Sequence, residues 1–102
     1  MEHRLQHEIL EATNEAQAII TPLFRRKTSN LPMFLNVEFV SGDTVVIFVP
    51  EDWPFYSYGV LLENNIQFAG SNYDYTINEK FSLKQLLVRC KQKGAFGAYD
   101  DV

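Results

Sequence analysis

The sequence contains a single cysteine, Cys90, so no disulfide can form within the chain. It has no apolar run that approaches the roughly 18–20 residues of a membrane-spanning helix. The first ten residues lack the basic start and the apolar stretch of a secretory signal. A lone thiol without a secretory signal is typical of a reducing compartment, and we therefore expect a cytoplasmic protein.

Basic residues are missing from half of the chain. Residues 28–79 contain no lysine or arginine, whereas seven acidic residues lie there: Glu38, Asp43, Glu51, Asp52, Glu63, Asp74 and Glu79. Residues 80–93 hold five basic residues and no acidic one: Lys80, Lys84, Arg89, Lys91 and Lys93. Either the basic segment lies beside the acidic one and neutralises it, or the chain offers an acidic face to a basic partner.

Sequence patterns for catalysis are also missing. His3, His7 and Glu11 share the spacing of a helical metal site, but we expect an ordinary solvated helix face there. No other histidine is present, so the chain lacks the partners for a nucleophilic triad. It has no Walker-type Gly-Lys-Ser/Thr sequence for a nucleotide phosphate. We expect no enzyme activity, no metal and no cofactor.

Length and composition suit one globular domain. Hydrophobic residues make up 46% and charged residues 22% of the 102 residues, which excludes a mostly disordered chain. The net charge of −4 argues against a protein that binds the phosphate backbone of nucleic acids generically. We expect residues 1–102 to form a single domain, with residues 95–102 as a tail that is either a docking segment or a frayed end.

The longest predicted helix covers residues 3–27. Its apolar residues recur at intervals of three and four, as one helical face requires: Leu5, Ile9, Ala12, Ala16, Ile19 and Leu23. Pro22 would kink this helix or end it near Thr21. The stripe either packs on the chain's own sheet or pairs with the same stripe of a second copy.

Two hairpins are predicted from alternating and β-branched segments. Residues 33–40 and 44–49 are joined by a turn at Ser41-Gly42-Asp43. Residues 45–49 are apolar on both faces, which predicts a strand that is central or covered on both sides. Residues 66–69 and 73–77 form the second predicted hairpin, around Gly70-Ser71-Asn72.

Residues 52–63 fit two structures. Phe55, Tyr58 and Leu62 keep helical spacing after Pro54, which favours a short helix. The alternative is a strand that turns at Asn64-Asn65.

The last helix is marked at both ends. Ser82 and Gln85 form a capping-box pattern, and Gly94 ends the helix. The predicted buried face holds Leu83, Leu86, Leu87 and Cys90. The order of elements predicts an α+β fold of two layers, in the order α-ββ-α-ββ-α. In this fold a four-stranded, largely antiparallel sheet carries the N- and C-terminal helices on one face.

Aromatic and acidic residues gather between the two predicted hairpins. Trp and Tyr dominate protein-binding hot spots because they bury a large area at a low entropy cost. We therefore predict a protein-binding module of the inhibitor, immunity or adaptor type that presents this surface to a basic protein. The predicted partner-binding residues are Glu51, Asp52, Trp53, Phe55, Tyr56, Tyr58, Tyr73, Asp74 and Tyr75.

Three alternatives stay open, one of which is a binder of a small ligand in an aromatic-lined pocket between sheet and helix. The chain could be a structural subunit of a homo-oligomer, formed through the stripe from Leu5 to Leu23 or between the acidic sheet of one copy and the basic helix of the next. In its strongest form the acidic face would imitate nucleic acid and inhibit a DNA- or RNA-binding protein. We expect neither a membrane nor a nucleic acid as a direct partner.

Overall fold

The computed structural model describes residues 3–24, 31–50, 57–62, 65–74 and 79–94. In these residues two helices and a five-stranded antiparallel sheet make an α+β fold. The elements are α1 (His3–Ala16), β1 (Ala18–Leu23), β2 (Phe34–Phe39), β3 (Thr44–Phe48), β4 (Ser57–Leu62), β5 (Asn65–Ser71), β6 (Tyr73–Asp74), β7 (Glu79–Lys80) and α2 (Leu83–Lys93).

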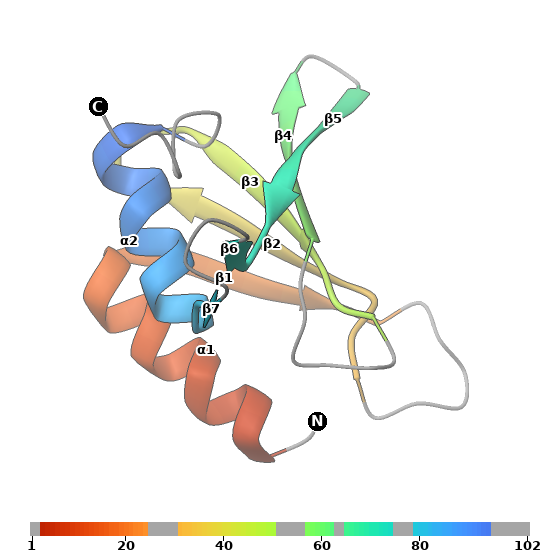
Figure 1. The fold of residues 1–102 in the computed structure, drawn as a ribbon, viewed down its shortest axis with the longest axis vertical. Coiled ribbons are helices and arrows are strands. Elements are labelled where there is room, and N and C mark those ends of the chain that lie inside the picture. Colours follow the sequence, from red (N-terminus) through yellow and green to blue (C-terminus); the bar gives the residue numbers. More distant parts are fainter. Residues whose placement is uncertain (1–2, 25–30, 51–56, 63–64, 75–78, 95–102) are drawn as a thin grey trace.

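The sheet is a simple meander. Its strand order is β1-β2-β3-β4-β5, and each strand pairs antiparallel with the next one along the chain. The two helices pack against each other over one face of this sheet (Figure 1). Neither helix in the described part of the chain is long and apolar enough to cross a membrane. The fold class was predicted correctly, but the numbers of strands and helices were not.

The predicted helix over residues 3–27 is wrong beyond residue 16. Gln17 adopts a left-handed backbone conformation (φ 53°), which ends α1 and turns the chain into β1. The run Ile19-Ile20-Thr21 favours a strand because β-branched side chains fit a pleated surface. Pro22 is tolerated because β1 is an edge strand of the sheet.

The six-residue apolar stripe is therefore not one helical face. Leu5, Ala12 and Ala16 are fully buried in the chain's own core. Ile19 and Leu23 lie on β1 and are exposed. A helix–helix seam that runs from Leu5 to Leu23 is not formed in this fold.

The first predicted hairpin is confirmed as β2 and β3. Val45 faces Val37 and Ile47 faces Leu35 across the two strands, and all four side chains are buried. As predicted for a strand with two apolar faces, β3 occupies the centre of the sheet. The helices cover one of these faces (Figure 1).

The predicted helix over residues 52–63 is corrected where the structure describes the segment. Residues 57–62 form β4, which pairs with β3 and β5, so the strand alternative is the one found. The second predicted hairpin is also rearranged. The strand that contains residues 66–69 pairs with β4, whereas β6, at Tyr73–Asp74, pairs with β7.

Helix α2 has the predicted boundaries. The side chain of Ser82 accepts from the backbone N–H of Gln85 (3.2 Å), and the side chain of Gln85 accepts from the N–H of Ser82 (2.9 Å). Glu8 of α1 accepts from the N–H of Leu83 (3.3 Å), which ties the two helices together. Gly94 stands at the C-terminal cap with φ 82°. The predicted buried face is confirmed: Leu83, Leu86, Leu87 and Cys90.

The segment before α2 is held by a buried asparagine. Asn72 is fully buried, and its side-chain amide donates to the carbonyl of Phe81 (2.8 Å). The N–H of Phe81 donates in return to the carbonyl of Asn72 (2.7 Å). This pair fixes the start of α2 against the end of β5, since buried polar groups need such partners.

Replacing Ser82 by alanine is expected to lower the free energy of unfolding by about 1 kcal/mol, because the N–H of Gln85 loses its acceptor. Urea unfolding measures the change. Gln85→Ala, which removes the reciprocal bond, should show a smaller loss. Full stability of the Ser82→Ala variant would contradict the role of the cap.

Replacing Gln17 by glycine tests the strain at the end of α1. Glycine adopts a positive φ freely, whereas alanine does not, and both variants lose the exposed hydrogen bond between Gln17 and Lys91 (2.8 Å). We expect Gln17→Gly to be more stable than Gln17→Ala by about 1 kcal/mol in urea unfolding. Equal stability of the two variants would show that the backbone here is unstrained.

Candidate functional site

The face of the sheet opposite the helices carries apolar side chains. Successive residues of a strand point to opposite faces, and cross-strand partners share a face. Leu35, Val37 and Ile47 point into the core beneath the helices, so their neighbours along the strands point away from it. We call this second surface the open face. Among the side chains that the structure describes, its apolar members are Ile19, Leu23, Phe34, Val46, Phe48, Ile66 and Phe68.

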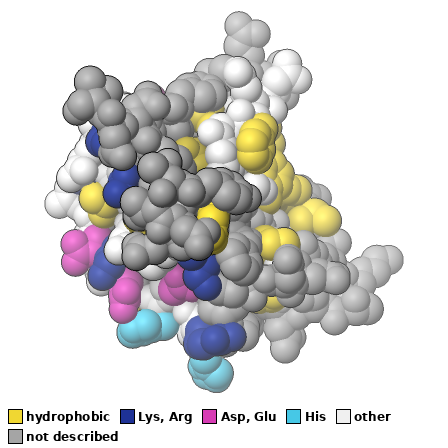
Figure 2. Space-filling view, in the orientation of Figure 1, with side chains coloured by type: hydrophobic (Ala, Val, Ile, Leu, Met, Phe, Trp, Pro, Cys, Tyr) yellow, Lys and Arg dark blue, Asp and Glu magenta, His cyan; other side chains and the backbone are white. Residues whose placement is uncertain are grey.

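Several apolar side chains of the open face are exposed. Ile19 and Phe68 are each 67% exposed, and Ile66 is 45% exposed. Nearer the middle, the rings of Phe34 and Phe48 meet edge to face with centroids 5.3 Å apart. Figure 2 shows hydrophobic side chains exposed beside β4 and β5, at the right of the view. The exposed apolar side chains of this face thus lie at its two edges, Ile19 on β1 and Ile66 and Phe68 on β5, whereas Val46 on the central strand is buried. Neighbouring exposed apolar groups such as Ile66 and Phe68 are typical of an interaction site.

The open face is almost free of charge. Glu38, which is exposed on β2, is the one charged residue in the five strands as the structure describes them. Its carboxylate accepts a long hydrogen bond from the amide of Asn36, two residues away on the same face (3.4 Å). In these strands, a partner would therefore meet one acidic side chain and no basic one.

Most of the predicted partner-binding residues lie outside the described residues: Glu51, Asp52, Trp53, Phe55, Tyr56 and Tyr75. Tyr73 is half-buried at the start of β6, where its N–H donates to Ser71 (3.3 Å). Asp74 follows it and pairs with Glu79 in the backbone register of β6 and β7.

Tyr58 belongs to the core. It is 1% exposed, and a Cβ atom placed on Gly70 would lie 3.2 Å from its ring, so the ring packs over that glycine. Its side chain also hydrogen-bonds to Cys90 of α2. Burial raises the pKa of the Cys90 thiol to about 12, an effect that this hydrogen bond partly opposes. Cys90 is thus a protonated core residue, as its position on the apolar stripe of the last helix predicted.

The open face is a feature that the sequence did not predict. Ile19 and Leu23 were assigned to a helix, and residues 66–69 were assigned to a hairpin with residues 73–77. The signal that could have found the face is the two-sided apolar pattern of residues 45–49, because a central strand with helices on one side leaves its other side to be covered.

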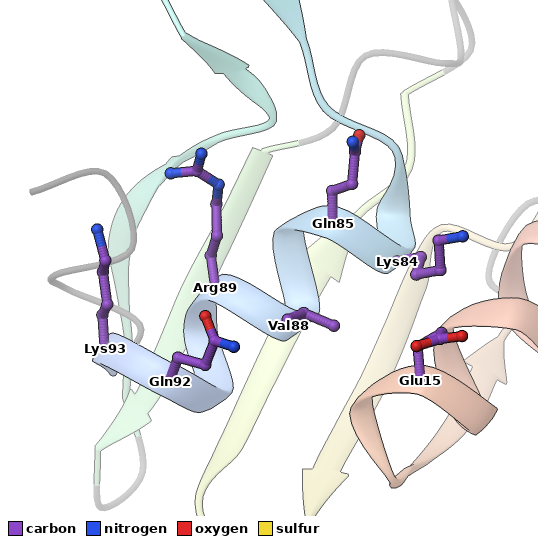
Figure 3. Close-up of a pocket in the computed structure, with 7 residues that line it drawn as sticks. All are labelled: Glu15, Lys84, Gln85, Val88, Arg89, Gln92 and Lys93. Atoms are coloured by element: carbon purple, nitrogen blue, oxygen red, sulfur yellow. The ribbon is translucent and has the colours of Figure 1, made fainter. Parts of the chain in front are cut away.

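A second feature lies on the outer side of α2. An open cavity of about 510 Å³ is lined by residues of α2 and by one residue of α1: Lys84, Gln85, Val88, Arg89, Gln92, Lys93 and Glu15. Figure 3 shows the side chains of Gln85, Arg89 and Lys93 extending from successive turns toward the same side of the helix. Among the described residues, three basic groups and one acidic group line this cavity.

The geometry of the described residues offers no metal centre. No group of three or more His, Cys, Asp or Glu side chains there is placed to hold an ion. His7 instead contacts the carboxylate of Glu11 (2.8 Å), and Lys84 approaches the same carboxylate (3.7 Å). Both pairs lie on exposed helix surface, where ion pairs contribute little to stability.

Comparison with known proteins gives no relative. Neither a protein-family model, nor a curated protein, nor a solved structure matches this chain. The surfaces described above are therefore the basis for inferring its function.

Proposed function

We propose that the chain is a non-catalytic protein-binding module whose open face docks onto a basic protein partner. The observation that carries the proposal is the exposure of Ile66 and Phe68 on β5, with Ile19 also exposed at the other edge of the same face. A sheet that is apolar on both faces is stable when both are covered. In this fold the helices cover one face, and a partner would cover the other.

The charge pattern supports a basic partner. The five strands carry Glu38 and no lysine or arginine. Between β3 and β4 the sequence adds Glu51 and Asp52 beside Trp53, which stay in the proposal as predicted contacts. An apolar surface that carries acidic but no basic residues complements an apolar patch with a lysine- or arginine-rich rim.

A matched pair of variants tests the proposal. Phe68→Ser removes an exposed ring from the open face, whereas Leu10→Ser removes a comparably exposed side chain (60%) from α1. Affinity capture from the native host, with quantitative mass spectrometry, should recover a basic protein with the wild type and with Leu10→Ser. Recovery with Phe68→Ser should fall about tenfold or more.

The capture experiment needs a folding control and a measurement of its salt dependence. Circular dichroism must show that both variants fold, and raising the salt concentration should weaken capture because the contacts are partly electrostatic. Equal recovery of the partner with the two variants would show that the open face does not bind it. The captured partner could also be a nucleic-acid-binding protein. If the nucleic acid that this partner binds competes with the chain for it, the chain acts by imitating nucleic acid.

A second candidate is a subunit that binds a second copy of itself through the same face. The near absence of charge on this face favours it, because two identical surfaces then meet without strong repulsion. Sedimentation of the pure protein would show a dimer that Phe68→Ser converts to a monomer and that Leu10→Ser leaves intact. A monomer at all concentrations would exclude this candidate.

A further inference from the structure

We propose that the outer side of α2 is a second binding site, which takes an extended acidic segment of a partner protein. This surface is separate from the open face. It consists of the cavity shown in Figure 3, and its charge is opposite in sign to that of the sheet. The chain would then contact a basic protein with its sheet and an acidic segment with its last helix.

The charge of the cavity indicates an anionic ligand. Helix α2 contains no acidic residue, and three of its basic side chains line the cavity: Lys84, Arg89 and Lys93. Lys91 is on the same helix but does not line the cavity, and its ammonium group donates to Gln17 (2.8 Å). Figure 3 shows Arg89 and Lys93 extending toward the same side of α2, whereas Lys84 points toward α1, where it approaches the carboxylate of Glu11 (3.7 Å). Arg89 and Lys93 are therefore the two cations that an anionic ligand on this side would meet.

Arg89 is held in a defined position. Its guanidinium carbon lies 4.3 Å from the centroid of the Phe81 ring, and Phe81 is itself buried. This cation–π contact orients the planar group. A guanidinium fixed in this way can donate two parallel hydrogen bonds to a carboxylate with less loss of side-chain entropy.

The spacing of the cations matches an extended peptide. Arg89 and Lys93 are four residues apart, which is about 6 Å along a helix axis. Every second side chain of an extended peptide lies on the same side, at intervals of about 6.8 Å. An acidic residue at every second position would therefore meet Arg89 and Lys93 in turn.

The other lining residues favour a peptide over a nucleic acid. The amide groups of Gln85 and Gln92 can both donate to and accept from a peptide backbone, and the half-buried Val88 offers an apolar contact. Glu15 places a carboxylate at the same cavity. This carboxylate would repel a strand that carries a phosphate on every unit, but a peptide with spaced charges can avoid it.

The test uses a short fluorescein-labelled peptide of alternating serine and glutamate, with the full chain in fluorescence anisotropy at low and high salt. Arg89→Gln and Lys93→Gln should each weaken binding about tenfold. Lys91→Gln removes the same charge from the same helix outside the cavity and should change binding less than about twofold. Because Arg89 packs on Phe81, Arg89→Lys replaces the first variant if circular dichroism shows that Arg89→Gln is unfolded.

Two further probes examine the ligand class. A peptide with the same number of glutamates in one contiguous block should bind more weakly than the alternating one, and an oligodeoxythymidylate of equal charge more weakly still. Equal effects of Lys91→Gln and Lys93→Gln, tighter binding of the oligonucleotide, or no salt-dependent binding of the alternating peptide would each overturn the proposal. The open face plays no part in these measurements, so they succeed or fail independently of the proposed function.

Discussion

The Leu86→Ala variant is expected to lose about 3–4 kcal/mol of the free energy of unfolding, as large-to-small changes in a packed core do. Leu86 is fully buried on the inner side of α2 and belongs to the cluster that joins both helices to the sheet. A domain of this size has roughly 5–10 kcal/mol of stability in total. Urea unfolding at neutral pH should therefore show a greatly lowered midpoint.

The matched control is Leu10→Ala on α1. Leu10 is 60% exposed, so the same chemical change should alter stability by less than about 0.5 kcal/mol. A similar loss in both variants would mean that burial does not distinguish the two leucines. In that case the packing of α2 on the sheet would have to be revised.

The Gly59→Ala variant is expected to lose about 2–3 kcal/mol, because the added methyl group overpacks the sheet. A Cβ atom on Gly59 would lie 2.5 Å from Cγ2 of Ile66 and 2.9 Å from the carbonyl oxygen of Gln67. The side chain of Ile66 can move, but the carbonyl belongs to the neighbouring strand. The pairing of β4 with β5, which is already irregular between Tyr58 and Gly59, must therefore open.

Hydrogen exchange locates this effect. Amides of β5 should exchange faster in Gly59→Ala, while those of α2 follow only the global loss of stability. The double variant Gly59→Ala/Ile66→Ala should recover part of the loss, because it removes one of the two clashes. Ser57→Ala in the same strand is the control, and a loss as large as that of Gly59→Ala would contradict this explanation.

The sequence predicted the elements whose signals are local. The turn at Ser41-Gly42-Asp43 and the capping box at Ser82 and Gln85 involve residues a few positions apart, and the structure has both the first hairpin and α2 where they were expected. Hydrophobic spacing was less reliable over residues 3–27. The intervals that place Ala16, Ile19 and Leu23 on one helical face do not reveal the left-handed residue at which the helix ends.

The helix predicted for residues 57–62 was wrong for a related reason. Tyr58 and Leu62 fit a helical spacing, and Tyr58 and Val60 fit a strand equally well. The outcome depends on β3 and β5, which lie on either side of β4 and satisfy its backbone groups. Such tertiary pairing cannot be inferred from the segment alone.

Of the two candidate surfaces, the sequence indicated the basic helix but not the open face. Charge segregation is visible in the sequence, and it indicated both the absence of lysine and arginine from the strands of the sheet and the basic last helix. The open face was not visible, because Ile19, Ile66 and Phe68 come from strands that only the fold brings into one sheet. The opposite error concerns Tyr58, which was predicted at an interface because of its residue type. Its register on β4 directs its side chain into the core.

Site-specific photocrosslinking tests the central claim most directly, namely that the open face docks onto another protein. A photoreactive phenylalanine analogue is placed at Phe68 in one variant and at Leu10 in the other, because both positions are highly exposed. Irradiation in the native host should join the Phe68 variant to one predominant polypeptide and leave the Leu10 variant unlinked. Equal labelling from the two positions, or no protein adduct at Phe68, would contradict the account.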